Sequence, residues 1–498
     1  MNESQIACHE LTNARSLRSK YQINRQIPIT EYLQDIKAIQ DIIQNGAVRT
    51  HSHKRLQILR HQYQLHVSMH SHAEHSDLHD QEIDIYNLPK VDNHIHLAAA
   101  FPPKMILDFF KEKLETNGDD EIEQGIKLKD IMNTDNITSE KLGIHATQDT
   151  FLRFDRFNYK YNLYNKELVR KVFLKTNNRL NGKYFGELTQ RLMNEERNHT
   201  ELRISIYGND PNEWQLLAEW MDRHQIMNCP TNKWVIQMPR IYHKLKTNNS
   251  KIQSFQTMID NFFDPIEKAI LHPDQYPDVH RLLQSVLGFD SVDDETVADT
   301  ITECTKLDGW TSNNNPPYEM YLISMHQRIS TLNRLRSERH QPVFQFRPHA
   351  GESGDIKHLV VTYLVANHIN HGIKLQENPA LMYLYYLDQI GISMSPTSNH
   401  YLVLKYKNSP FKKFFECGLA VTLSTDDPMF FHLSDNPLLE EYIIARHMWD
   451  LDMVDLFEIA SHSVVQGQLE SKNWCSPTRL HFRKERLVQE RQIIEIAQ

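Results

Sequence analysis

The amino-acid sequence predicts an α/β fold, a (β/α)8 TIM-type barrel with helical insertions and an N-terminal helical extension. Beyond Tyr86, short apolar runs rich in β-forming residues alternate with longer helical patterns, which is typical of repeated βα units. Eight such runs can be placed, and eight parallel strands close a barrel. The expected strands are Lys90–His96, Leu202–Tyr207, Trp234–Pro239, Val286–Asp290, Val343–His349, Asn367–His371, Ile392–Pro396 and Ala420–Thr425.

The expected domain organisation places the barrel at residues 86–498, after an N-terminal extension. Residues 1–29 are polar and lack periodic apolar positions, which predicts a flexible tail. Residues 30–85 are expected to hold two amphipathic helices, TEYLQDIKAIQDIIQ with Thr30 as N-cap and HKRLQILRHQYQLHV, followed by a histidine-rich linker. We interpret the linker as solvated, with a metal-binding tract as the alternative. Its histidines are His66, His70, His72, His75 and His79.

Two long stretches between the expected strands are predicted insertions. They cover Phe101–Glu201 and Ser291–His340, and extra helices there are expected to shape the mouth of a site.

The composition is that of a globular protein with a large core. The 498 residues include 40% hydrophobic and 24% charged residues and only 15 glycines, which argues against collagen-like or wholly disordered chains. The net charge of −9 offers no broad basic surface to nucleic acid or to an anionic membrane. An anionic ligand would therefore need a local basic pocket.

Cysteine usage and the absence of a targeting pattern predict a cytoplasmic protein. The N-terminus lacks the apolar core of a secretory signal, and no window approaches the roughly 20 apolar residues of a membrane span. Export directed by an unrecognised targeting signal would leave the same features, and it stays an alternative. The five cysteines are scattered without a CxxC pair, which favours a reducing compartment: Cys8, Cys229, Cys304, Cys417 and Cys475.

Histidines at strand ends are the first chemical signal. In KVDNHIHLAAA, His94 and His96 stand two residues apart, so the period of a strand points both imidazoles to one face. In VFQFRPHAGESG, His349 ends another strand and Glu352 follows three residues later, where a carboxyl group can act as general acid without being a ligand. Barrel enzymes place their catalytic groups at the carboxyl ends of strands.

The remaining signals come from two further strand ends. AVTLSTDDPMFFH ends in Asp426 and Asp427, of which one can coordinate metal while the other faces substrate, and INHG carries His371 as a candidate base. Each element alone has an ordinary alternative, such as a helix cap or a hydrogen-bonded core histidine. Together, three histidines and an aspartate with a further glutamate and histidine indicate a hydrolytic metal site with an open position for water.

These residues lie in motifs that resemble the AMP deaminase family, within the adenosine deaminase branch of the amidohydrolases. HxH and HAGE are shared with adenosine deaminases, whereas two of the segments resemble motifs of the nucleotide enzymes, FDRFNYKYN and GFDSVDDE. The similarity runs from about Thr30 to Gln489. It is carried by KVDNHIHLAAA, FDRFNYKYN, FLKTNN with NGKYF, RISIYG with PNEW, WVIQMPRIY, GFDSVDDE, FRPHAGESG, INHGIKL, MSPTSNH and LSTDDPM.

The resemblance implies zinc-dependent hydrolysis of AMP to IMP and ammonia. It makes Glu352 the proton donor to purine N1, His371 the proton acceptor and Asp427 the residue that holds N7. One zinc ion per chain would be held by His94, His96, His349 and Asp426. Substrate-binding positions would be His96, Lys160, Tyr161, Asn162, Leu163, Tyr164, Asn165, Glu352, Asp427, Pro428, Met429 and Phe430.

Departures from the family pattern keep other functions open. Phe430 stands where the family has glutamine, His400 replaces an asparagine and Leu163 replaces a proline. The alternatives are an adenosine or modified-adenylate deaminase and a non-catalytic purine-binding homologue. A nucleic-acid deaminase is disfavoured because the H-x-E and P-C-x-x-C pair is absent. The implied partners are a small-molecule purine nucleotide, with no nucleic acid or membrane span, and further copies of the chain in a homodimer or homotetramer.

Overall fold

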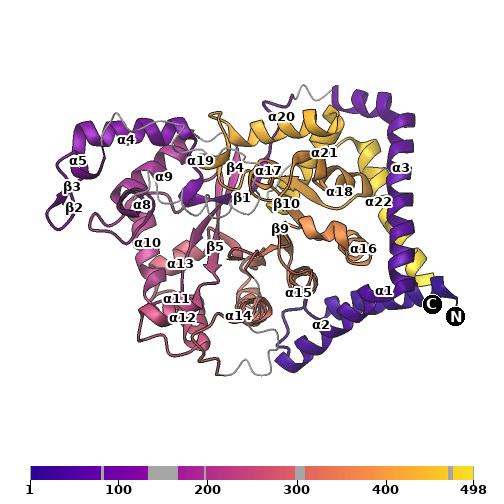
Figure 1. Cartoon of the computed structure of the whole chain (residues 1–498), viewed down its shortest axis with the longest axis horizontal. Helices are drawn as coiled ribbons and strands as arrows, with labels where there is room; N and C mark the ends of the chain where they lie inside the picture. Colours follow the sequence, from indigo (N-terminus) through magenta and orange to yellow (C-terminus); the bar gives the residue numbers. More distant parts are fainter. Residues whose placement is uncertain are drawn as a thin grey trace.

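The structure is a computed structural model that describes residues 2–79, 84–132, 167–195, 198–297, 309–468 and 475–496. Strands occupy its centre, the first and last helices line one side, and a group of helices that follows the first strand extends from the opposite side (Figure 1). Among the helices of these ranges, none combines the length and the apolar character that a membrane span requires.

All eight expected strands form, and all pair in parallel. The two sheets run in the orders β1-β4-β5-β6-β7 and β11-β10-β9-β8. The expected strand Val343–His349 appears as two short pieces, β7 and β8. The strands are β1 (Val91–His96), β4 (His199–Ser205), β5 (Asn232–Pro239), β6 (Val286–Val292), β7 (Gln345–Phe346), β8 (His349–Ala350), β9 (His368–His371), β10 (Gly391–Met394) and β11 (Val421–Leu423).

Two junctions join the sheets into the strand order of a barrel. Between β7 and β8, the Arg347 amide donates to the carbonyl of Phe289 in β6 at 2.8 Å, and Pro348 accepts from the Asn370 amide of β9 at 3.1 Å. At the other junction, Ile95 of β1 forms a parallel bridge with Asp426, just beyond β11. The first strand therefore lies beside the last, and the predicted (β/α)8 fold is confirmed.

Helices separate the strands and cover the ring. η1 (Leu97–Ala99) follows β1 directly. The first insertion carries α4 (Pro103–Asn117), β2 (Glu121–Glu123), β3 (Ile126–Lys127), α5 (Leu128–Ile131), α8 (Glu167–Leu174) and α9 (Lys183–Glu195). The others are α10 (Glu213–Arg223), α11 (Tyr242–Asn248), α12 (Phe255–Leu271), α13 (Pro277–Leu283), α14 (Tyr318–Ser337), α15 (Lys357–Val365), η4 (Ile373–Glu377), α16 (Pro379–Leu387), α17 (Pro396–Leu402), η5 (Tyr406–Asn408), α18 (Phe411–Cys417), α19 (Pro428–Phe431), α20 (Pro437–Trp449), α21 (Met453–Gln466) and α22 (Pro477–Ile496).

The expected flexible tail at residues 1–29 is wrong, because most of it is helical. Helix α1 (Glu3–Ser19) begins with a capping box between Asn2 and Gln5 and packs against the third helix and α22. Its buried face consists largely of small side chains, which do not stand out as an apolar stripe in the sequence: Ala7, Cys8, Leu11 and Ala14. The next helix, α2 (Ile29–Gln44), starts one residue before the expected N-cap, Thr30, and Pro28 occupies the cap position.

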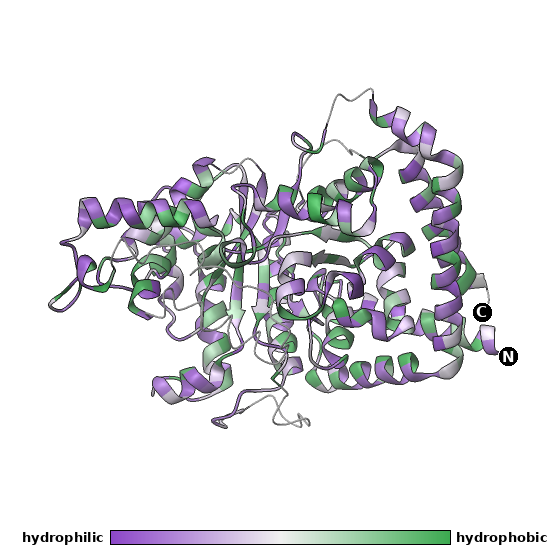
Figure 2. Cartoon of the chain, turned by 45° about the horizontal axis from the view of Figure 1, so that its top comes forward, coloured by the Kyte–Doolittle hydropathy of each residue, from purple (hydrophilic) through white to green (hydrophobic). Residues whose placement is uncertain are grey.

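The expected histidine-rich linker is also wrong, because the third helix, α3 (Gly46–His79), runs through it without a break. Most of its length is hydrophilic (Figure 2). His66 is buried, stacks on Phe482 of α22 at 4.0 Å between ring centroids and shares a 2.8 Å hydrogen bond with Glu74. The other histidines of the tract are exposed, and within the described part of the chain they form no group of three metal-ligand side chains.

A buried ion cluster fixes the end of α3 to the C-terminal helices. Arg479 of α22 donates to both carboxylate oxygens of Glu74, at 2.7 and 2.9 Å, and also to Asp455 and Glu458 of α21 at 2.8 and 3.1 Å. Burial alone would raise the pKa of Glu74, but the hydrogen bonds from His66 and Arg479 outweigh it and lower the pKa to about 2. The carboxylate therefore stays charged in the folded protein.

We expect Glu74→Gln to lower the free energy of unfolding by about 3 kcal/mol near neutral pH, because it leaves a buried guanidinium with an incomplete set of partners. The folded pKa lies below the unfolded one, so the contribution is complete above about pH 5 and is lost as the pH falls towards 2. Chemical denaturation at several pH values measures it. The control is Asp41→Asn, which breaks an exposed pair with Lys37 and should cost less than about 1 kcal/mol. An equal loss of unfolding free energy in both variants would contradict the stabilising role assigned to Glu74.

Candidate active site

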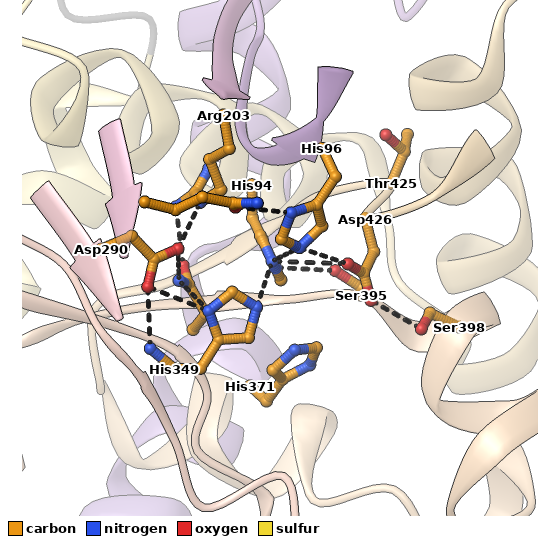
Figure 3. A network of polar contacts seen from close by, with 12 residues as sticks. His94, His96, Arg203, Asp290, His349, His371, Ser395, Ser398, Thr425 and Asp426 are labelled. Atoms are coloured by element: carbon orange, nitrogen blue, oxygen red, sulfur yellow. Dashed lines mark hydrogen bonds and ion pairs between the residues drawn. The ribbon is translucent and has the colours of Figure 1, made fainter. Parts of the chain in front are cut away.

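Five of the predicted site residues meet at the carboxyl ends of the strands (Figure 3). His94 and His96 come from β1, and His349 comes from β8. His371 ends β9, and Asp426 follows β11. All five are buried, with exposed fractions of 8% or less.

The nitrogen and oxygen atoms of this cluster are spaced as ligands of one ion. His94 Nε2 lies 3.0 Å from His349 Nε2, 3.3 Å from His96 Nε2 and 3.4 Å from Asp426 Oδ1. His96 Nε2 lies 3.3 Å from the same carboxylate oxygen. Four ligands at about 2.0–2.2 Å from a tetrahedral zinc stand roughly 3.3–3.6 Å apart, so the donor set is close to what such an ion needs. His371 also belongs to this group, since one of its nitrogens lies within 4.8 Å of ligand atoms of His94, His349 and Asp426.

Neighbouring side chains orient the ligand atoms. The Nδ1 atoms of His96 and His349 lie 2.8 Å from Gln237 Oε1 and 3.0 Å from Asp290 Oδ1. Each Nδ1–H can donate to its oxygen, which leaves the Nε2 lone pair directed at the cluster. Ser398 donates to the second oxygen of Asp426 at 2.7 Å. The ligands are therefore held in place by the barrel itself.

A buried arginine, Arg203, holds the carboxylate of Asp290 in place. Arg203 of β4 donates to Asp290 Oδ2 at 2.8 Å, and Asn370 of β9 donates to the same oxygen at 3.2 Å. Burial alone would raise the pKa of Asp290, but His349 and Arg203 outweigh it and hold the pKa well below the usual range. Asp290 thus remains a carboxylate and an acceptor for His349. Burial, followed by the charge of Arg203, lowers the pKa of His94, which favours the neutral form that binds metal.

Glu352 lies in a turn whose backbone amides donate to the carboxylate of Glu295. Glu295 accepts from the backbone amides of Gly351 at 3.2 Å, Glu352 at 2.7 Å and Ser353 at 3.4 Å, and from His358 Nδ1 at 2.9 Å. The turn needs glycine at 351, where φ is 70°. Burial raises the pKa of Glu352 well above its usual range, and the charges of Asp426 and Glu295 raise it further. This environment favours the protonated form of the Glu352 carboxyl group.

His371 faces Glu352 across a shared asparagine. Asn399 Nδ2 lies 3.1 Å from His371 Nδ1 and 3.4 Å from Glu352 Oε1. Burial lowers the pKa of His371 to about 4, so the imidazole is neutral and has a lone pair that can accept a proton. His371 and Asp426 both have a positive φ, of 70° and 65°, a backbone strain that concentrates at functional sites.

The remaining predicted site residues fall into three groups. Asp427 lines the same pocket as the cluster, whereas Met429 and Phe430 are buried in α19 and do not line it in the described part of the chain. Pro428 is likewise buried at the first position of α19. The segment Lys160–Asn165, with Arg153 and Arg156, lies outside the described residues.

The cluster opens into a pocket of about 1490 Å³ among the described residues. His96, Glu352 and Asp427 lie in its wall, together with side chains that follow β4 and β5. It is large enough for a ligand well beyond the size of a free base.

Sequence reasoning did not assign roles to several residues that shape this site. Asp290 and Glu295 both lie in GFDSVDDE, so the motif signalled the region but not the contacts. Gln237 and Asn399 likewise lie in WVIQMPRIY and MSPTSNH, but their contacts join partners more than 20 residues apart along the chain, which the motifs do not reveal.

Comparisons with known proteins show the family of the chain. The family model described as AMP deaminase matches residues 1–490. The AMP deaminase 3 of Mus musculus is 41% identical over 455 residues, which cover 88% of this chain and 59% of that protein. The AMP deaminase of Saccharomyces cerevisiae is 38% identical over 469 residues, which cover 90% of this chain and 58% of that protein. The chain thus spans about three fifths of the length of these relatives. Among solved structures, an adenine deaminase from Arthrobacter aurescens aligns with a TM-score of 0.45 and 15% identity, covering 81% of this chain and 99% of that chain.

Proposed function

Because this chain belongs to the AMP deaminase family, we propose that it hydrolyses the 6-amino group of AMP and releases IMP and ammonia. The observation that carries the proposal is the buried donor cluster with a protonated glutamate and a neutral histidine beside it, all facing one pocket. A hydrolytic deaminase needs those three elements together.

The proposed cofactor is one zinc ion per chain, held by His94, His96, His349 and Asp426. Three imidazole nitrogens and one carboxylate form a donor set that zinc takes in catalytic sites, and the spacing of 3.0–3.4 Å between donor atoms supports it. When bound there, zinc supplies a water nucleophile by lowering its pKa towards about 7.

The protein's own groups are proposed to move the protons of the reaction. Glu352 donates its proton to N1 of the purine, which draws electrons into the ring and prepares C6 for attack. His371 would accept a proton from the attacking water and pass it to the 6-amino group, whose bond to C6 breaks to release ammonia. The ionised Glu352 would take the remaining hydroxyl proton as the C6 carbonyl forms, and Asn399 holds both side chains in register. Asp427, in the pocket wall, is proposed to hold N7 of the base.

A second candidate activity is the deamination of adenosine or of a modified adenylate. The observation that favours it is Phe430, whose ring cannot make the side-chain hydrogen bond of the glutamine that the family pattern has at that position. The same zinc chemistry would deaminate either substrate. The preference for a substrate that carries a phosphate therefore distinguishes the two candidate activities.

We expect AMP to be turned over at least about tenfold more efficiently than adenosine, in kcat/KM, which corresponds to roughly 1.4 kcal/mol. Lys160→Ala should reduce the AMP value selectively, because a charged hydrogen bond to phosphate contributes about 1.5–3 kcal/mol. Ammonia release from both substrates, with zinc content measured in the same preparation, tests this. Equal efficiencies in the native protein would favour the second candidate.

The resemblance also supports two further proposals, that copies of the chain associate as a homodimer or homotetramer and that the protein acts in the cytoplasm. Light scattering of the purified protein tests the first, and fractionation of cells tests the second. A monomer at micromolar concentration would overturn the oligomer proposal.

A further inference from the structure

One buried arginine in the pocket, Arg240, has nitrogen donors that make no hydrogen bond with the described residues. Arg240, directly after β5, is only 4% exposed. Its Nη1 donates to the carbonyl and the hydroxyl of Ser291, at 2.9 and 3.3 Å. Its Nε and Nη2 have no hydrogen-bond partner among the described residues, and both retain accessible surface. The side chain lines the pocket, so these donors are available to a ligand.

Packing fixes the guanidinium of Arg240 without neutralising it. Its Cζ lies 4.8 Å from the ring centroid of Tyr318, and the backbone carbonyl of Arg240 accepts from Asn315 at 2.6 Å. In the part of the chain that the structure describes, no carboxylate lies within ion-pair distance of it. Asp293 and Glu295 also line the pocket, near enough for the charge of Arg240 to act on both, but Glu295 is engaged by the turn around Glu352 and Asp293 lies beyond ion-pair distance. A buried cation without a paired acid is costly unless an anion meets it.

The other cationic side chains of the pocket differ from Arg240, and two of them, Arg170 and Lys244, are not buried. Arg203 is paired with Asp290, and Lys171 is paired with Glu123. Lys175 donates to the Tyr207 hydroxyl at 2.8 Å, and Arg223 is exposed and donates to the carbonyl of Asn181. Arg240 is therefore the buried cation whose donors best suit an incoming anion.

The position of Arg240 along β5 places it above the metal cluster. Gln237 of the same strand contacts His96 Nδ1 at 2.8 Å, and the ladder continues three residues further, where the Arg240 amide donates to Val292 at 2.9 Å. At 3.2–3.4 Å per residue, Arg240 stands about 10 Å further towards the pocket mouth. A nucleotide whose base lies at the cluster would have its ribose and phosphate at about this distance from the cluster.

We propose that Arg240 binds the phosphate of the substrate through its two remaining nitrogen donors. The planar guanidinium offers Nε and Nη2 side by side, which matches two oxygens of a phosphate dianion. This inference rests on the proposed function, and it adds Arg240 to Lys160 as a residue that distinguishes nucleotides from nucleosides.

The test compares AMP with adenosine in the metal-loaded full chain and in Arg240→Gln. Loss of a charged hydrogen-bond pair is expected to lower kcat/KM for AMP about 10- to 100-fold, while adenosine turnover and metal content stay within about twofold. Arg240→Lys should recover part of the loss, because it keeps the charge but not the paired donors. The matched control is Arg223→Gln, which should leave both substrates unaffected.

Several outcomes would overturn the proposal. They are an equal loss for AMP and adenosine, no loss for AMP, or the same selective loss in Arg223→Gln. Inorganic phosphate should inhibit AMP turnover competitively in the native protein and more weakly in Arg240→Gln. Non-competitive inhibition or activation that disappears in Arg240→Gln would assign the residue to a separate effector site instead.

Calorimetry with inorganic phosphate alone separates this proposal from the proposed function. If the native protein binds phosphate and Arg240→Gln does not, the anion site stands even when AMP releases no ammonia. If the native protein deaminates AMP while both proteins bind phosphate alike, the function stands and the Arg240 assignment fails.

Discussion

Replacing His349 with alanine is expected to remove both the bound metal and the activity. The imidazole contributes a donor atom 3.0 Å from His94 Nε2, and its loss leaves an incomplete ligand set. No cysteine lies in the site motifs to replace it. Because Asp290 keeps its contacts with Arg203 and Asn370, the barrel should still fold.

Metal analysis of the purified variant, with ammonia release from AMP and circular dichroism, measures this prediction. The control is His70→Ala, which removes an exposed histidine of α3 and should leave about one metal ion per chain. Asp290→Asn should give an intermediate result, since an altered partner of a ligating histidine typically costs 10- to 100-fold in metal affinity. Full turnover in metal-free His349→Ala would refute the ligand assignment.

Glu352→Gln is expected to preserve the fold and the metal while reducing kcat by about 10²- to 10⁴-fold, because general acid catalysis contributes that much. The carboxyl group is buried and protonated, and it lies 3.4 Å from the amide of Asn399. Glutamine keeps the shape and can still accept the hydrogen bond from Asn399, but it cannot release a proton to the purine.

Steady-state kinetics with AMP separate this role from binding. A loss confined to KM with kcat intact would make Glu352 a binding residue. Glu377→Gln serves as the control, because Glu377 is paired with Lys374 on the surface and should leave both parameters unchanged.

Local patterns were enough to predict the barrel and the meeting of potential ligand side chains at its strand ends. The strands are short, buried and followed by helices, and parallel strands bring their carboxyl ends to one edge. His94, His349 and Asp426 therefore met where the strand ends predicted. Which of them bind metal, and whether Lys160–Asn165 and Pro428–Phe430 bind substrate, stay predictions.

The features that sequence reasoning missed depend on distant partners. Helix α1 buries alanine and cysteine, whose small side chains give no clear stripe, and α3 continues past His66 because Arg479 binds Glu74 from the other end of the chain. Glu295 acts on the Glu352 turn through backbone amides, a role that residue identity does not reveal. Such contacts become visible only in three dimensions.

The pairing of the first strand with the segment after the last strand determines when, during synthesis, the donor cluster can form. His94 and His349 are 255 residues apart, and Asp426 comes from beyond the eighth strand. A ribosome must therefore make almost the whole barrel before a complete set of donors exists. A chain that ends before Asp426 would keep the HxH pair without the full donor set, so uptake of the proposed ion would report that synthesis has passed Asp426. An ion held as proposed would tie the two ends of the ring together and resist their separation.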